Sequence, residues 1–384
     1  MKYRSLANSE IKVSEIALGC EGFTNKTLEE TKELLKYCFD NGINFIDFYT
    51  SNPELRSNFG EALKELEIRK DFIVEGHLCS TWRDGQYERT RDIQKTKEAF
   101  EDLLTRLQTD YIDVGMIHYI DDEKDFNKVF DGEIMEYAKS LKEEGKIKLL
   151  GISSHNPIIA KKAVETGLID VIMFSINPCY DVQPASEDCN DLWDEKKYEN
   201  VEFRIDKDRE ELYEICEKKN VSLTVMKCYG GGDLLDSDLS PFKVALTPTQ
   251  CINYCLTRPG VSAVMLGVKN VNEVDEALKF ESASKEEKDY GTILAKLPRN
   301  NMKGKCVYCG HCAPCAVGID IASVNKYVAL VKAEKEIPET VREHYKVLNH
   351  HASECIKCGR CESNCPFGVS IIEKMEEAIE IFGF

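Results

Sequence analysis

Short apolar runs alternate with amphipathic stretches along about the first 280 residues of this 384-residue chain. Runs of four to eight apolar residues between turn signals predict buried strands, and a 3.6-residue periodicity predicts helices. Eight such strand–helix units predict a parallel (β/α)₈ barrel covered by helices, in which buried parallel strands are continuous apolar runs. An open doubly wound sheet is the alternative, but the turn ALGCEGF after the first strand lacks the glycine-rich phosphate loop that such sheets carry. The candidate strands are SEIALG, NFIDF, DFIVEG, YIDVGMIH, KLLGIS, VIMFSI, SLTVMK and SAVMLG.

The composition is that of a soluble globular protein, with 42% hydrophobic and 31% charged residues. No apolar run approaches the ~18 residues that a membrane span needs, and charged residues interrupt the N-terminal segment where a signal peptide would be apolar. The formal net charge of −18 argues against nucleic acid or an anionic membrane as partner. We therefore expect a cytoplasmic protein that acts on a small molecule, and the oligomeric state is left open.

One connection is much longer than the others. The segment from Cys179 to Lys207 is acidic and follows the sixth predicted strand, where a barrel usually needs only a few residues. Such a segment at the catalytic end of a barrel is either a lid or a solvated insertion.

The chain has seventeen cysteines, which in the absence of an export signal are expected to be reduced. Nine of them are scattered before Lys305 and are interpreted as small core residues. These nine are Cys20, Cys38, Cys79, Cys179, Cys189, Cys216, Cys228, Cys251 and Cys255.

The other eight cysteines form two dense runs, CVYCGHCAPC and CIKCGRCESNCP. Three thiolates at CxxCxxC spacing hold three corners of one cubane, and a fourth thiolate further along, often before a proline, reaches the other cluster. This rule predicts two [4Fe–4S] clusters with crossed ligands: Cys306, Cys309, Cys312 and Cys365 for one, and Cys355, Cys358, Cys361 and Cys315 for the other.

Zinc and disulfides are the alternatives for these runs. Zinc sites use paired CxxC knuckles, and disulfides between residues so close in sequence are strained, so both fit the spacing less well. Ala316 departs from the proline that usually follows the fourth cysteine. We predict a barrel domain over residues 1–285 and a small, mainly α-helical, ferredoxin-like iron–sulfur domain over residues 286–384.

Polar residues stand at the carboxyl ends of the predicted strands, where the active sites of such barrels lie. Asp47 and Tyr49 end the second strand and, being two residues apart, point to the same side. The others are His77 after the third strand, His118 after the fourth, Ser153 and Ser154 at the fifth, Lys227 at the seventh and Gly267 after the eighth.

The segments GINFIDFYTSNPELRSNFGEAL, DYIDVGMIHY, EEGKIKLLGISSHN and LTPTQCINYCLTRPGVSAVMLGVKNVNEVDEAL resemble the aldo/keto reductase family in content and order. The resemblance covers residues 1 to about 285, and with the cysteine tail the chain is similar to the branch that carries a ferredoxin-type domain. It implies reduction of a carbonyl by a nicotinamide hydride, with an aspartate, a tyrosine, a lysine and a histidine as the catalytic residues. The family's tyrosine is the proton donor, and its pKa is lowered by the lysine.

Half of that tetrad is replaced here. Asp47 and His118 match the pattern, but the tyrosine position holds Asn52 and the lysine position holds His77. Because an amide cannot donate a proton as a phenol does, two hypotheses follow: Tyr49 supplies the acid from the same strand, or His77 paired with Asp47 is itself the general acid.

The resemblance also implies a nucleotide site that is only partly retained. Lys269 and Asn270 lie in a segment similar to the family's phosphate-binding turn. Ser153 and Ser154 lie where the family contacts the nicotinamide carboxamide, but Met173 replaces a frequent glutamine. With Lys227 and Gly267, these residues are the candidate cofactor contacts, and the sequence leaves NADP(H) binding open.

Electron counting separates three functions. A hydride carries two electrons and iron–sulfur clusters pass one at a time, yet no flavin motif is visible. The chain is therefore an iron–sulfur oxidoreductase that reduces a carbonyl or other oxygenated substrate, a reductase or redox-assisted lyase fed by ferredoxin or flavodoxin, or a non-catalytic electron-transfer subunit. Oxygen-sensitive clusters and many thiols are typical of an anaerobe.

Overall fold

The structure is a computed structural model of the full chain. It describes residues 1–187, 205–240, 244–284, 286–290, 304, 306, 312–332, 337, 339–365 and 368–384. Within these residues, every helix is too short or too polar to cross a membrane. The chain divides into two compact units: the first is Met1–Thr81, Arg89–Glu187 and Lys196–Arg299, and the second is Trp82–Glu88, Asp188–Glu195 and Asn300–Phe384.

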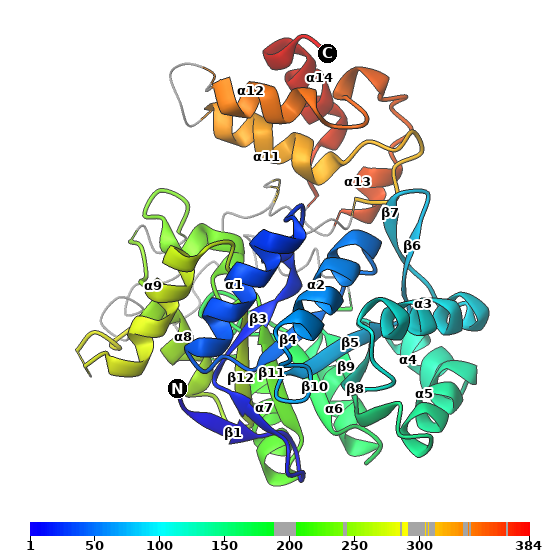
Figure 1. Ribbon diagram of the computed structural model, residues 1–384, viewed down its shortest axis with the longest axis vertical. Coiled ribbons are helices and arrows are strands. Elements are labelled where there is room, and N and C mark those ends of the chain that lie inside the picture. Colours follow the sequence, from blue (N-terminus) through cyan, green and yellow to red (C-terminus); the bar gives the residue numbers. More distant parts are fainter. Residues whose placement is uncertain are drawn as a thin grey trace. The chain divides into compact units, whose positions relative to one another are not determined.

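The first unit is a closed barrel of eight parallel strands, so the predicted fold class is confirmed and the open doubly wound sheet is wrong (Figure 1). The strands follow each other around the barrel in the order β3, β4, β5, β8, β9, β10, β11, β12, and β12 pairs with β3 to close it. Each coincides with one of the eight predicted apolar runs. Their bounds are β3 Ile16–Gly19, β4 Phe45–Phe48, β5 Ile73–Leu78, β8 Ile112–Ile117, β9 Ile147–Ser154, β10 Val171–Ser175, β11 Ser222–Met226 and β12 Val261–Leu266.

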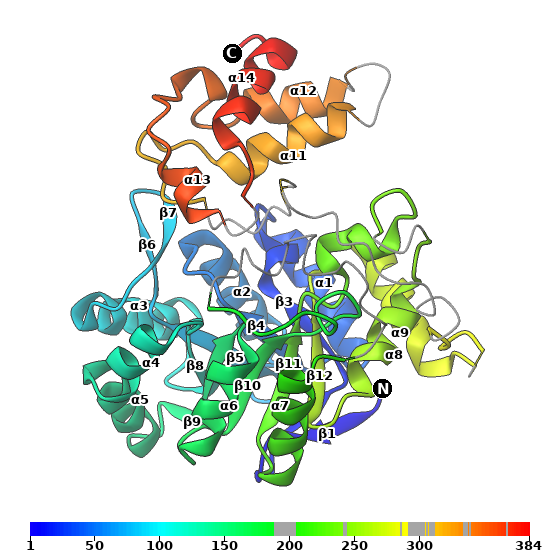
Figure 2. The same cartoon turned by 180° about the vertical axis from the view of Figure 1, so that it is seen from behind.

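Helices surround this barrel and separate its strands in the sequence (Figure 2). Several begin at side-chain caps that the sequence supplies: Thr27 and Glu30 form a capping box at α1, and Thr247 and Gln250 form another at α8. The helices are α1 Leu28–Asp40, α2 Pro53–Glu65, α3 Ile93–Arg106, α4 Glu123–Phe130, α5 Glu133–Glu143, α6 Pro157–Glu165, α7 Lys207–Lys218, α8 Pro248–Leu256 and α9 Val271–Ser282, with short 3₁₀ helices η1 Cys20–Phe23 and η4 Gly230–Leu235.

Alternate residues of the strands fill the barrel interior, because successive side chains of a strand point to opposite faces. Gly151 makes room in this interior, since a Cβ atom there would lie 2.3 Å from the Met116 sulfur. The apolar part of the filling includes Ala17, Phe45, Val114, Met116, Leu149, Val171, Met173, Ala263 and Met265. The same alternation carries Asp47, Glu75 and His77 inward from β4 and β5, two or four residues after Phe45 and Ile73.

The chain also forms two small antiparallel hairpins. β1 Tyr3–Ser5 pairs with β2 Lys12–Ser14, and β6 Ser80–Arg83 pairs with β7 Gln86–Arg89. The second unit is helical, as predicted, with α11 Ile321–Lys332, α12 Glu339–Lys346, η5 Ala352–Glu354, α13 Arg360–Asn364 and α14 Ile371–Phe382. The predicted boundary between residues 285 and 286 stays a prediction.

The beginning of the long acidic connection is buried and not solvated. Cys179, Tyr180 and Asp181 are buried, and Asp181 accepts hydrogen bonds from the hydroxyls of Tyr213 and Tyr254 at 2.6 and 2.8 Å. Residues 188–204 of this connection, expected as a lid or a solvated insertion, lie outside the described residues. The scattered cysteines are buried, as expected for core residues, except that Cys189 also lies outside the described part.

Candidate active site

Three of the predicted catalytic residues lie in one row at the carboxyl end of the barrel. His77 Nε2 lies 2.9 Å from Asp47 Oδ1, and His77 Nδ1 lies 2.7 Å from His118 Nδ1, where one ring nitrogen donates to the other. Asp47 is near the end of β4, His77 is in β5, and His118 directly follows β8. His118 is 7% exposed and His77 is 3% exposed, so His118 is the outer ring. His77, in the family's lysine position, therefore contacts both Asp47 and His118, the two residues that match the family pattern.

Glu75 lies beside this row and was not predicted from the sequence. It is fully buried, pairs in register with Asp47 on the neighbouring strand, and precedes His77 by two residues, so both point into the barrel. Burial and the charge of Asp47 raise the pKa of the Glu75 carboxyl well above its usual value, and the Thr224 hydroxyl on β11 offsets this only in part. The inward position of Glu75 could have been predicted from the sequence, because residues two apart on a strand point to the same side and Glu75 lies two residues before His77.

A second aspartate–histidine pair lies at the ends of β8 and β9. His155 Nδ1 lies 2.9 Å from Asp121 Oδ2, and Asp121 Oδ1 accepts hydrogen bonds from the His155 backbone nitrogen at 2.6 Å and the Ser154 hydroxyl at 3.1 Å. Burial alone would raise the pKa of Asp121, but His155 and these hydrogen bonds lower it to about 2. The predicted cofactor contact Ser154 is thus a structural partner of Asp121, which the sequence analysis missed.

Tyr49, the alternative acid, and Asn52, which stands at the family's tyrosine position, each have a partner in the fold. The Tyr49 hydroxyl lies 2.9 Å from Glu21 Oε1, and the Tyr49 ring stacks near His118 with ring centroids 6.5 Å apart. Asn52 caps α2, where its side-chain oxygen accepts a hydrogen bond from the Leu55 backbone nitrogen at 3.1 Å. An asparagine is a favoured residue at this capping position, which gives Asn52 a structural task.

Acidic side chains lie at the predicted nucleotide-phosphate turn. The Lys269 backbone nitrogen donates to Glu273 Oε2 at 2.8 Å, and Asn270 caps α9 by accepting from the Glu273 backbone nitrogen at 3.0 Å. A Cβ atom on Gly267 would lie 3.8 Å from a carboxylate oxygen of Glu21. Carboxylates in this turn compete with a phosphate for the same backbone donors and repel it.

The remaining predicted cofactor contacts lie at the ends of their strands. Ser153 is buried in β9, and its hydroxyl has no hydrogen-bond partner among the described residues. Lys227 follows β11 and adopts a left-handed backbone with φ of 64°, which ends the strand sharply. These positions lie at the carboxyl ends of β9 and β11.

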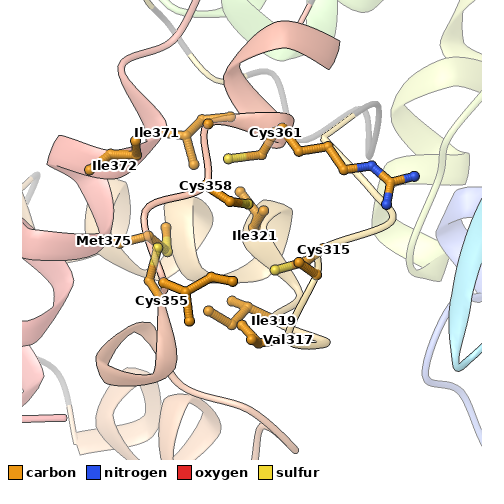
Figure 3. Close-up of a pocket in the computed structure, with 14 residues that line it drawn as sticks. Cys315, Val317, Ile319, Ile321, Cys355, Cys358, Cys361, Ile371, Ile372 and Met375 are labelled. Atoms are coloured by element: carbon orange, nitrogen blue, oxygen red, sulfur yellow. The ribbon is translucent and has the colours of Figure 1, made fainter.

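In the second unit, four predicted cluster ligands line one pocket (Figure 3). They are Cys315 from the first cysteine run and Cys355, Cys358 and Cys361 from the second. The rest of the lining is mostly apolar and includes Ile319, Ile321, Ile371 and Met375. Four thiols that share an apolar pocket match the ligand set and surroundings of a [4Fe–4S] cluster.

The other predicted ligand set is described only in part. Cys312 and Cys365 are buried and Cys306 is partly exposed, whereas Cys309 lies outside the described residues. Within the same unit, the Gln86 side chain holds the backbone of Cys315: its amide donates to the Cys315 oxygen at 3.2 Å, and its Oε1 accepts from the Cys315 nitrogen. Gln86 therefore supports the backbone of one predicted cluster ligand, a contact that cysteine spacing could not reveal.

Comparison with protein families decides the affiliation of the barrel. Residues 15–249 match the model of the aldo/keto reductase family. The chain belongs to the aldo/keto reductase family. Residues 303–369 match a 4Fe-4S dicluster domain, so this is an oxidoreductase of the aldo/keto reductase type with an iron–sulfur domain.

Individual relatives agree with this affiliation. An uncharacterized oxidoreductase of Bacillus subtilis, YqkF, is 28% identical over 306 residues, which cover 74% of this chain and 92% of the relative. The Bacillus subtilis aldo-keto reductase YhdN is 31% identical over 164 residues, covering 40% of this chain and 47% of YhdN. The fold of the Bacillus halodurans aldo-keto reductase AKR11C1 superposes with a TM-score of 0.60 at 24% identity, over 78% of this chain and 97% of that protein.

Proposed function

We propose that this aldo/keto reductase reduces a carbonyl or another oxygenated small molecule at the barrel mouth, with Asp47, His77 and His118 in place of the family's complete tetrad. The observation that carries the proposal is the continuous row of contacts, 2.9 Å from Asp47 to His77 and 2.7 Å from His77 to His118. A row of this kind can hold a proton and move it toward the substrate.

The proton follows a short path in this proposal. Asp47 places a carboxylate at the inner end of this path, 2.9 Å from His77. His77 passes a proton from Nδ1 to Nδ1 of His118, and His118, as the outer ring, delivers a proton to the oxygen of the reduced substrate. The histidine row thus replaces the tyrosine that position 52 does not provide. Tyr49 remains the alternative acid, although its hydroxyl is engaged by Glu21.

The electrons have two candidate sources. The acidic side chains Glu21 and Glu273 at the phosphate turn disfavour NADP(H) and favour the second candidate function, a reductase or redox-assisted lyase fed by a ferredoxin or flavodoxin through the iron–sulfur domain. A bound [4Fe–4S] cluster supplies single electrons at low potential. On this route a carbonyl becomes an alcohol by taking two electrons, one at a time, from the reduced ferredoxin or flavodoxin, and two protons. The residues at the mouth bind the substrate and deliver the proton to its oxygen, and water supplies the proton that goes to carbon.

A turnover assay separates these functions. Cluster-loaded protein is incubated without oxygen with a panel of aldehydes, ketones and other oxygenated compounds, and with either NADPH or reduced methyl viologen as electron donor. We expect product with methyl viologen and a loss of turnover in His77→Ala. Turnover with NADPH alone would assign the nicotinamide route. If the viologen oxidation rate is independent of every compound and of His77, the chain is an electron-transfer subunit and the proposal fails.

The ligand assignment of the clusters is also a proposal. We assign Cys315 to the cluster of Cys355, Cys358 and Cys361, because these four thiols line one pocket, and Cys306, Cys309, Cys312 and Cys365 to the other. Cys315→Ser should therefore lower the iron content by about half and leave one cluster spectrum, whereas Cys216→Ser in the barrel should leave iron unchanged. Loss of all iron, or of none, in Cys315→Ser would contradict the crossed assignment.

A further inference from the structure

The barrel interior contains three buried side chains whose polar atoms converge. Asp47, Glu75 and His77 each offer one oxygen or nitrogen atom, and these atoms all lie within 4.8 Å of one another. They come from two adjacent strands, and each residue is at most 4% exposed. One nitrogen and two carboxylate groups around one point are a donor set that divalent metals use in proteins.

The contact between His77 and Asp47 is short but is not a hydrogen bond. The two atoms are 2.9 Å apart, yet His77 Nε2 and Asp47 Oδ1 both lack a hydrogen-bond partner among the described residues, because the ring N–H direction misses the oxygen. Two ligand atoms that lie this close without a hydrogen bond between them can both coordinate one cation. At metal–ligand bonds of about 2.1 Å with right angles, neighbouring donors are about 3.0 Å apart.

Glu75 provides the second, independent observation. The side chain is 0% exposed, and neither carboxylate oxygen has a hydrogen-bond partner within the part of the chain that the structure describes. Buried carboxylates are normally paired, hydrogen-bonded or bound to a metal. The Ser175 hydroxyl also lacks a partner there, and the Thr224 hydroxyl, which lowers the pKa of Glu75, lies near the carboxylate without reaching it in hydrogen-bond geometry. A cation would satisfy the carboxylate, and its water ligands could reach the hydroxyls.

We infer that Asp47, Glu75 and His77 bind one six-coordinate divalent cation of the Mn²⁺ or Fe²⁺ class inside the barrel. Carboxylates favour Mn²⁺ and imidazole favours Fe²⁺, while the close spacing of Asp47 and His77 fits octahedral better than tetrahedral geometry. The cation is separate from the iron of the clusters, which thiolates hold. It would take His77 Nε2 and leave Nδ1 in contact with His118, as expected for a metal-bound histidine whose other nitrogen is fixed by a neighbour.

The inference does not depend on the proposed reduction, because it is tested by binding alone. Mn²⁺ is added to the full-length, cluster-loaded protein, and free Mn²⁺ is followed by its room-temperature EPR signal. We expect one tight site per chain, and nitrogen coupling to the bound Mn²⁺ in pulsed EPR. In Glu75→Gln the site should bind at least about tenfold more weakly, and in His77→Gln the nitrogen coupling should disappear.

Asp121→Asn is the matched control. It removes a buried carboxylate that also lies 2.9 Å from a histidine nitrogen but is fully hydrogen-bonded, so Mn²⁺ binding should be unchanged. Thermal melts establish that each variant is folded, and if Glu75→Gln is not, Asp47→Asn takes its place. Absence of a tight site in the wild type, or equal binding by the wild type and the Glu75 or Asp47 variant, overturns the inference.

Discussion

The barrel mouth contains two aspartate–histidine pairs that look alike by distance and differ in their surroundings. Both bring a carboxylate oxygen within 2.9 Å of a ring nitrogen. Asp121 and His155 form a real hydrogen bond, supported by Ser154 and the His155 backbone. Asp47 and His77 do not complete one, and instead face Glu75 on one side and His118 on the other.

The two pairs differ in whether the buried carboxylate has all of its hydrogen-bond partners. A carboxylate with all of its partners in place stabilises the fold and has nothing left to offer a ligand. A buried group without partners costs stability, and such groups concentrate where a site binds or reacts. We therefore assign the Asp121 pair to stability and the Asp47 pair to chemistry.

The largest expected difference between the pairs is in turnover. His77→Ala should lower kcat by about 10²- to 10⁴-fold, because it removes a group that transfers a proton, whereas His155→Ala should change kcat by less than about tenfold. The measurement is the anaerobic reduction assay on the best compound of the panel. His77→Gln, which keeps the volume of the side chain, should be as impaired as His77→Ala. Equal losses at His77 and His155 would remove the distinction.

Stability should change in the opposite order. Asp121→Asn should lower the free energy of unfolding by up to about 2 kcal/mol, since the pKa of Asp121 falls from 3.8 to about 2 in the fold. Glu75→Gln breaks no geometrically complete hydrogen bond among the described residues, and glutamine keeps an oxygen that the nearby Thr224 hydroxyl can approach, so it should cost less than about 0.5 kcal/mol. Urea unfolding with a chelator present measures both. A larger loss in Glu75→Gln than in Asp121→Asn would mean that Glu75 has a structural partner.

The contribution of Asp121 should also depend on pH. The pKa of its carboxyl is lowered on folding to about 2, so its stabilisation is fully present above the unfolded value near 4 and is lost as the pH falls toward 2. The difference in unfolding free energy between wild type and Asp121→Asn should therefore shrink as the pH falls from 4 to 2.5. A difference that grows over this range contradicts the lowered pKa.

The smallest effect is expected at Tyr49. Its hydroxyl contacts the exposed side of Glu21, and one such hydrogen bond contributes about 1 kcal/mol. Tyr49→Phe should thus lower kcat by no more than about fivefold. A loss as large as that of His77→Ala would make Tyr49 the proton donor and leave the His77 pair without a catalytic task.

The strands of the barrel and the grouping of the cysteines could be predicted from patterns of neighbouring residues. The eight strands were found because each is a continuous apolar run between turns, and the shared thiol pocket agrees with ligands that the CxxC spacing had already grouped. Asp47, His77 and His118 were found because each ends a strand. In all of these cases the information lies within a few residues of sequence.

The features that were missed depend on register between strands. Glu75 matters because β4 and β5 pair it with Asp47, and Asp121 matters because a loop after β8 reaches His155 after β9. Neither contact follows from periodicity within one segment. The burial of Asp181 is similar, since its partners Tyr213 and Tyr254 are distant in the sequence.

A double-mutant cycle on His77 and His118 tests the central claim, that these two rings act as one proton-transferring unit. The turnover of His77→Ala, His118→Ala and the double variant is compared with that of the wild type in the same anaerobic assay. Residues that act as a unit are non-additive, so we predict that the double variant is about as slow as the slower single variant. If the two losses multiply, the histidines act independently and the account of the site is wrong.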